Sequence, residues 1–301
     1  MNRIKCYFTL ALAVTFWCSA FVVSKIALDD LPPITLCTCR FLIAFCVLYP
    51  FVRNRGFRLG LLFRRQSFLF GISGTGSNLV LLTIGLTACS AGMSSIAHGL
   101  FPVFMVFFGY IMLKERMNRF KWVSVIFSLI GVAVACAGNV DLEGTKAWGV
   151  GLVILSVFTW AFYSVFVKKH SAELSGWILT EVTFGTAFLA CLPLAIIECI
   201  YVGNVSFPEP MSWVSILYLS IFSSIIGIGL WNIGVKEVSP AVSGVYFNLT
   251  PAIGLAIAVI AGEGCSWMQI VGCALIVIGV LAGSKGDMLE AAEEQKNQKQ
   301  D

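Results

Sequence analysis

The chain has 301 residues, of which 58% are hydrophobic and 12% charged, and its mean hydropathy is +0.89. This is more apolar surface than one water-soluble core can bury, so a soluble enzyme is excluded and no nucleic-acid partner is expected. The net charge of +4 comes from lysines and arginines that lie mainly between apolar runs, so it indicates topology in a lipid bilayer rather than an anionic partner.

Apolar runs follow one another along almost the whole chain. A helix needs roughly 20 such residues to cross about 30 Å of hydrocarbon. In chain order, the runs lie near 7–26, 34–52, 67–87, 92–113, 120–138, 147–167, 177–201, 213–235, 240–261 and 267–284. The sequence therefore predicts an all-α integral membrane protein with ten transmembrane helices and a polar cytosolic tail at 286–301.

The positive charges alternate between the two sides of this predicted topology. They gather before the first helix and after the even-numbered helices, whereas Lys25 and Lys146 lie on the other side. Because cytoplasmic loops carry an excess of Lys and Arg, we expect both termini in the cytoplasm and a location in the plasma membrane, the inner membrane of a bacterium.

The second half of the chain repeats residues of the first half. The matched pairs include Trp17/Trp160, Lys25/Lys168, Pro50/Pro193, Ser94/Ser243, Leu100/Leu249 and Pro102/Pro251. Because each half holds five predicted helices, an odd number, the second copy must cross the membrane in the opposite sense. We therefore expect two inverted five-helix repeats, at 1–140 and 141–285, as in carriers that work by alternating access.

These repeated motifs also carry a resemblance. The chain has Trp17 and Lys25 in helix one, Arg40-Phe41 in helix two, and a stretch from Ser90-Ala91-Gly92 through Pro102 to Glu115-Arg116 that recurs as Ser239-Pro240-Ala241 through Pro251 to Glu263. From about Leu10 to Gly283 it resembles the EamA-type exporters of the drug/metabolite transporter superfamily, with Cys18 and Gly264 departing from the family pattern. The resemblance implies a ten-helix carrier with a central cavity between its halves.

Two prolines near the middle of helices four and nine indicate where a substrate would bind. Pro102 and Pro251 remove a backbone donor, so the carbonyl oxygens of His98 and Phe247 are expected to lose their helical partners. Such oxygens are tolerated at mid-membrane where they line a cavity or contact protein, although a packing kink alone remains an alternative. The candidate substrate-binding residues are Trp17, Asn78, Ser94, His98, Phe101, Pro102, Trp160, Tyr163, Trp231, Asn232, Ser243, Phe247, Thr250 and Pro251.

Three ionisable side chains inside predicted helices are candidates for coupling or gating. His98 could bind substrate or carry a proton, or it could be an ordinary hydrogen-bonded histidine. Arg40 could attract an anionic group or extend outward to the interface. Glu181 could bind a proton, and its expected depth, on the order of 13 Å from Arg40, argues against an ion pair between them.

The sequence thus favours a secondary-active transporter that exports a small metabolite, such as an amino acid, with the proton as a candidate co-substrate. An organophosphate or nucleotide-sugar exchanger is an alternative, but it would need several buried cations, and only Arg40 lies well inside a predicted helix. From other classes, an intramembrane serine protease (Gly71-Ile72-Ser73-Gly74 with His98) and a membrane receptor or scaffold stay open. Metal-site and phosphate-loop motifs are absent, so no cofactor is expected.

Overall fold

The computed structural model describes residues 3–114, 119–137, 146–171, 173–203, 208–237, 246–247, 250–279 and 281–282, and every secondary-structure element among them is helical. The elements of the first half are α1 (Arg3–Leu28), α2 (Pro33–Arg53), η1 (Leu59–Phe63), α3 (Arg65–Phe70), η2 (Gly71–Gly76), α4 (Ser77–Leu86), α5 (Ala91–Ala97), η3 (His98–Leu100), α6 (Phe101–Leu113) and α7 (Arg119–Ala137). The third crossing is α3–η2–α4, and the fourth is α5–η3–α6.

The second half has the same plan. Its elements are α8 (Ala147–His170), α9 (Gly176–Val202), α10 (Pro210–Tyr218), η4 (Leu219–Ile228), α11 (Gly229–Glu237), α13 (Thr250–Ile260) and the apolar helix Trp267–Gly279. Within the described residues, seven helical stretches are long and apolar enough to cross a membrane, and three shorter apolar helices stand at the predicted fifth, ninth and tenth positions. The ten-helix prediction is confirmed, while much of the expected start of helix nine and the tail at 286–301 lie outside the described residues.

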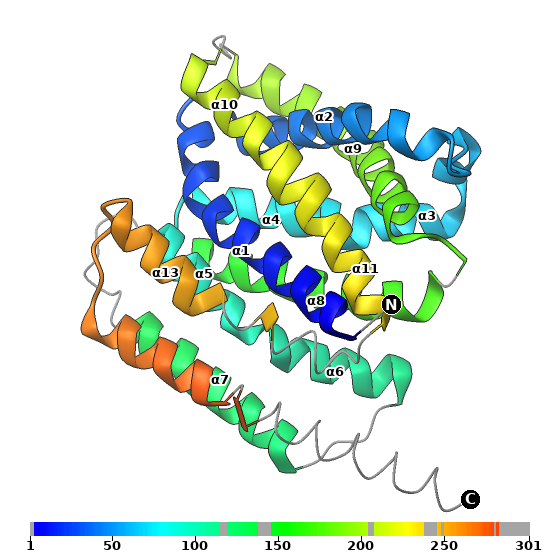
Figure 1. Ribbon diagram of the computed structural model, residues 1–301. Coiled ribbons are helices and arrows are strands. Elements are labelled where there is room, and N and C mark those ends of the chain that lie inside the picture. Colours follow the sequence, from blue (N-terminus) through cyan, green and yellow to red (C-terminus); the bar gives the residue numbers. More distant parts are fainter. Residues whose placement is uncertain are drawn as a thin grey trace, which may run out of the picture.

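The packing of the helices follows the repeat. α1 contacts α11, η4 and α13, and its counterpart α8 makes the matching contacts with α4, η2 and α6. α2 packs against its own counterpart α9, and α5 against α13. At the lower edge of Figure 1, α7 lies beside Trp267–Gly279, where a Cβ at Gly131 would lie only 2.6 Å from Gly272 O. This exchange of partners is what two inverted five-helix repeats require.

The third and eighth crossings both contain a widened, π-helical segment, η2 in one and η4 in the other. In η2, a Cβ at Gly71 would lie 2.0 Å from Thr186 Oγ1, and one at Gly74 would lie 2.1 Å from the ring of Tyr163. Glycine is therefore required for this crossing to approach α8 and α9 closely. Such segments occur frequently at functional sites.

Large apolar side chains cover the perimeter of the bundle. Ile197, Ile200 and Tyr201 on α9, together with Ile260 and Trp267, are among the most exposed of them. Exposed apolar residues on this scale are expected where lipid tails, rather than water, surround a helix bundle. The protein is a multi-pass membrane protein.

At one end of the bundle, carboxylates of one half accept hydrogen bonds from helix starts in the other half. Glu198 of α9 accepts hydrogen bonds from the backbone N–H groups of Ile34 and Thr35 (3.1 and 2.7 Å) and from Thr35 Oγ1 (2.8 Å). Glu263 accepts from the N–H groups of Ala91 and Gly92, both at 2.8 Å. These donors are the ones that a helix start leaves unpaired.

Two more contacts belong to this end, which we call the bridged face. Asp30 Oδ2 accepts from Glu209 N (2.8 Å) and Ser212 Oγ (2.6 Å) at the start of α10. Lys25 Nζ lies 3.5 Å from Glu263 Oε1. Gly262 has a φ of +96°, the left-handed conformation that glycine adopts readily, and it turns the chain just before Glu263. At the bridged face, three carboxylates therefore hold the two halves together by hydrogen bonds.

Candidate substrate cavity

A cavity lies between the two halves, with an empty volume of about 510 Å³. The first half contributes residues from α1, α2, α4 and η3, and the second contributes residues from α8, η4, Phe247 and α13. Its lining residues are Trp17, Ala20, Phe21, Arg40, Asn78, Leu79, Leu82, His98, Trp160, Ser223, Ile228, Phe247 and Thr250. Seven of these were sequence candidates: Trp17, Arg40, Asn78, His98, Trp160, Phe247 and Thr250. The structure thus brings together candidates that are up to 233 positions apart in the sequence.

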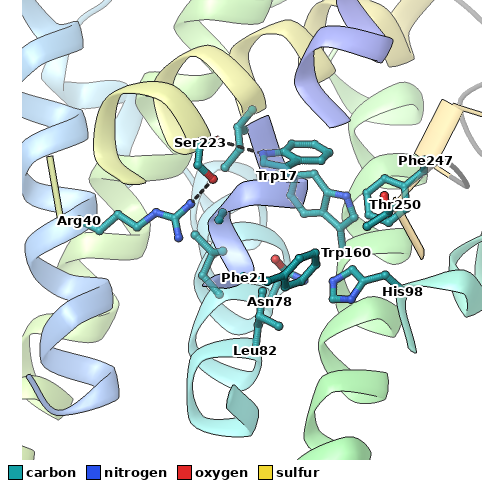
Figure 2. Close-up of a pocket in the computed structure, with 13 residues that line it drawn as sticks. Trp17, Phe21, Arg40, Asn78, Leu82, His98, Trp160, Ser223, Phe247 and Thr250 are labelled. Carbon is teal, nitrogen blue, oxygen red and sulfur yellow. Dashed lines mark hydrogen bonds between the residues drawn. The ribbon is translucent and has the colours of Figure 1, made fainter. Parts of the chain in front are cut away.

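Among the described residues, Arg40 is the one arginine or lysine in the lining, and it is only 4% exposed. Its Nε donates to Ser224 Oγ at 2.6 Å and its Nη2 donates to Ser223 Oγ at 2.8 Å. Figure 2 shows the guanidinium pointing into the cavity. The alternative in which Arg40 extends outward to the interface is therefore wrong, because η4 offers hydroxyl acceptors inside the bundle.

Aromatic rings form the other side of the cavity, across from Arg40 in Figure 2. The ring centroids of Trp17 and Trp160 lie 5.3 Å apart, edge to face, and Trp17 lies 5.8 Å from Phe247. His98 stacks on Phe247 at 6.0 Å and meets Phe21 edge to face at 4.9 Å. Trp17 is held in place by a hydrogen bond from its Nε1 to Ser223 O (2.9 Å), so the residue that binds Arg40 also positions this wall.

Several buried polar atoms at or beside the cavity lack a hydrogen-bond partner among the described residues. Trp160 Nε1 and Thr250 Oγ1 belong to lining residues, and Ser94 Oγ lies one helical turn before His98. Trp160 is 4% exposed and Thr250 is 1% exposed. Leaving a buried donor unpaired costs about 1–3 kcal/mol. These atoms therefore have hydrogen-bonding capacity that the described residues leave unused, and Trp160 and Thr250 place two of them on residues of the cavity lining.

The fourth crossing breaks at its proline, but not in the way that the sequence indicated. His98–Leu100 forms a single 3₁₀ turn, and Pro102 lies in the first turn of α6. The N–H of Phe101 donates to His98 O, so the expectation of an unpaired His98 carbonyl is wrong. His98 Nδ1 lies 2.7 Å from Ser94 O and must carry its proton, because a carbonyl oxygen only accepts.

The other sequence candidates lie behind the lining. Phe101 stacks on Phe247 at 4.0 Å, and Trp231 packs 5.3 Å from Trp17 while donating to Ser164 Oγ. Tyr163 donates to Asn232 Oδ1 at 3.0 Å. Pro102 and Pro251 are buried outside the lining, and Ser243 lies outside the described residues. Phe101 and Trp231 thus pack against lining residues from behind, while Tyr163 and Asn232 bond to each other outside the lining.

Glu181 is fully buried on α9, and neither of its carboxylate oxygens has a hydrogen-bond partner in the described part of the chain. It is not among the cavity-lining residues. Among the described residues, Arg40 forms its side-chain hydrogen bonds with Ser223 and Ser224 and not with Glu181. Glu181 is thus a buried acid set apart from the cavity.

The protease-like motif has a structural explanation. Ser73 donates its hydroxyl hydrogen to Leu69 O within the same helical segment, and His98 is bonded to Ser94. The motif's two glycines permit the close packing of η2 described above. In the residues that the structure describes, no group of three or more His, Cys, Asp or Glu side chains could hold a metal ion.

The sequence missed six lining residues: Ala20, Phe21, Leu79, Leu82, Ser223 and Ile228. Most of these are apolar and do not differ from lipid-facing residues in sequence. Ser223 and Ser224 did give a signal, since two adjacent hydroxyl side chains stand in the middle of an apolar run.

Comparison with known proteins agrees with this architecture. The model of the EamA-like transporter family matches residues 4–136 and again 147–283. A "Probable amino-acid metabolite efflux pump" of Salmonella typhimurium is 25% identical, and the match covers 91% of this chain and 92% of that protein. The uncharacterized inner membrane transporter YedA of Escherichia coli is 25% identical, with 92% and 90% covered.

A protein of known crystal structure superimposes with a TM-score of 0.66 at 22% identity, covering 92% of this chain and 94% of that one, and so has the same fold. The two family matches fall on the two halves whose helices exchange partners across the cavity. The chain belongs to the EamA-like transporter family.

Proposed function

We propose that the protein is a secondary-active transporter that exports a small metabolite, such as an amino acid or a related compound, across the plasma membrane by alternating access. The observation that carries the proposal is the cavity between the two halves, lined by aromatic side chains and one buried cation. Rigid-body rocking of one half against the other would expose this cavity to each side in turn. In this proposal, residues 1–140 and 141–285 are the two moving units, and both termini are cytoplasmic.

The bridged face supports this mechanism. Glu198, Glu263 and Asp30 each join one half to the other, and each satisfies backbone donors at a helix start. For the cavity to open at this face, these hydrogen bonds must break, and water must replace them. The conformer described here is therefore the one that is closed at the bridged face, which would be the extracellular side.

Proton coupling is part of the proposal, with Glu181 as the candidate proton site. A carboxyl group that is fully buried without a partner is costly to keep ionised inside a membrane protein. A change in its protonation would thus be tied to a conformational change that admits water. A sugar-nucleotide or organophosphate exchanger is less well supported, because Arg40 is the one Lys or Arg that the described part of the chain contributes to the cavity lining.

The test is flux of amino acids in proteoliposomes, together with metabolite profiling of cells that overproduce the protein. Ala20→Trp would fill the cavity and should abolish flux, whereas Thr15→Trp places the same ring on the exposed side of α1 as a matched control. Equal flux from the two variants would contradict transport through this cavity. If the unaltered protein moves no candidate metabolite, the receptor or scaffold alternative gains support.

A further inference from the structure

We propose that the cavity binds a monocarboxylate with an apolar or aromatic body, with the carboxylate on Arg40 and the body against the ring wall of Trp17, Trp160 and Phe247. The inference rests on the proposed function, since it assigns a ligand class to the transport cavity. It starts from Arg40, whose charge is buried at 4% exposure. Among the described residues no carboxylate forms an ion pair with it, and its two hydrogen-bond partners are neutral hydroxyls.

A buried cation with only neutral partners is a costly feature in a protein interior, and an anion placed beside it would offset that cost. A guanidinium group has five N–H donors, and Ser223 and Ser224 occupy two of them. The remaining donors form a planar fork that matches the two oxygens of a carboxylate. Ser223 and Ser224 therefore orient Arg40 and leave the anion-binding donors free.

The charge count favours a carboxylate over a phosphate. Arg40 compensates a single negative charge, and the other ionisable lining residue, His98, commits its Nδ1–H to Ser94 O. A phosphate monoester carries up to two negative charges near neutral pH, so it would bring a second charge that no further lysine or arginine of the described lining residues can compensate. The chemistry that fits this cavity is therefore a monoanion.

The wall opposite Arg40 selects the rest of the ligand. Trp17, Trp160 and Phe247 offer ring faces and edges, on which apolar and aromatic groups pack well. In this wall, Trp160 Nε1 and Thr250 Oγ1 have no hydrogen-bond partner within the described part of the chain. A ligand that spans from Arg40 to this wall needs its carboxylate at one end and its apolar body at the other.

The probes for a test are 3-phenylpropionate, its neutral amide 3-phenylpropanamide, and phenyl phosphate. Binding to the purified full-length protein can be followed by tryptophan fluorescence, because Trp17 and Trp160 line the cavity. We expect the carboxylate to bind roughly tenfold or more tightly than the amide, because charge-assisted hydrogen bonds are the stronger ones. We expect phenyl phosphate to bind more weakly than the carboxylate.

Arg40→Gln should remove the preference for the carboxylate over the amide, and Arg40→Lys should retain part of it. Arg53→Gln, an exposed position on the same helix, is the matched control and should leave the preference unchanged. Equal binding of carboxylate and amide by the unaltered protein, tighter binding of phenyl phosphate, or no binding of the carboxylate would each overturn the inference. These outcomes do not require any variant to fold. If the protein transports a metabolite but does not prefer the carboxylate over the amide, the ligand assignment is contradicted and the proposed function is not. If it prefers the carboxylate but transports nothing, the proposed function is contradicted and the ligand assignment is not.

Discussion

The polar groups of the bridged face have hydrogen-bond partners in the opposite half, whereas several polar groups of the cavity lack partners among the described residues. At the bridged face, Glu198 and Glu263 each accept at least two backbone hydrogen bonds from the opposite half. In the cavity, the residues that the structure describes leave Trp160 Nε1 and Thr250 Oγ1 without partners and give the Arg40 guanidinium only hydroxyl acceptors. Satisfied polar groups hold a conformer together, whereas unsatisfied ones favour a ligand. The difference separates the part that keeps the halves closed from the part that binds.

The largest expected effect comes from removing two bridges at once. The double variant Glu198→Gln/Glu263→Gln replaces charge-assisted hydrogen bonds to the starts of α2 and α5 with weaker neutral ones. Each replacement should cost the closed conformer roughly 1 kcal/mol or more. We expect the equilibrium to move roughly tenfold or more toward the conformer open at the bridged face. The measurement is labelling of Leu82→Cys, a cavity position, in a background without other cysteines. Unchanged labelling from that side would contradict the role of the bridges.

Gly254→Ala tests the helix contact that runs from the bridged face toward the cavity. A Cβ at Gly254 of α13 would lie 2.4 Å from Ser95 Cβ of α5, so the two helices must separate. We expect a loss of about 1–3 kcal/mol in the free energy of unfolding. Gly151→Ala is the matched control, because a Cβ there meets nothing within 4 Å, and alanine in a helix should be neutral or stabilising. Unfolding in detergent compares the two.

A smaller expected effect is a difference between Trp160 and Trp231 when each is replaced by phenylalanine. Trp160→Phe removes an indole N–H that has no partner among the residues described, so no such hydrogen bond is lost; stability should hold within about 1 kcal/mol while ligand affinity falls. Trp231→Phe removes the hydrogen bond to Ser164 Oγ and should lower stability instead. Thermal unfolding and ligand titration on both variants give the comparison. The reverse pattern would mean that Trp160 supports the fold rather than the ligand.

The smallest effect is a pH dependence at the bridged face. Hydrogen bonds from Ser212 Oγ and Glu209 N hold the pKa of Asp30 below its ordinary value. A carboxyl group whose pKa is depressed by folding contributes stability above its unfolded pKa and loses it as the pH falls through the folded pKa. We therefore expect the thermal stability of the unaltered protein to exceed that of Asp30→Asn at neutral pH, and the gap to close on acidification. A gap that widens in acid would contradict this.

The helices could be predicted from the sequence because an apolar run is a local property of the chain. Lining residues such as Trp17 and Trp160 could be predicted because they match each other across the repeat. Tyr163, Trp231 and Asn232 were also sequence candidates, but they are not among the lining residues, since which face a helix turns toward a cavity depends on its neighbours. Ser223 was missed because its role depends on the widened turn of η4 and on Arg40, 183 positions away. The His98 carbonyl was misjudged because a 3₁₀ turn supplies the donor that the proline removed.

The bridge from Glu198 also breaks the symmetry of the duplication. At the offset that pairs Pro193 with Pro50, Arg55 is the counterpart of Glu198. An arginine cannot accept hydrogen bonds from a helix start, and the start of α9 is capped locally by Ser175, whose Oγ accepts from Ile178 N. Identical halves would give the two end conformers equal energy. Because Glu198 and Arg55 differ, the conformer closed at the bridged face should have the lower free energy. We therefore expect the carrier without substrate to populate mainly this conformer.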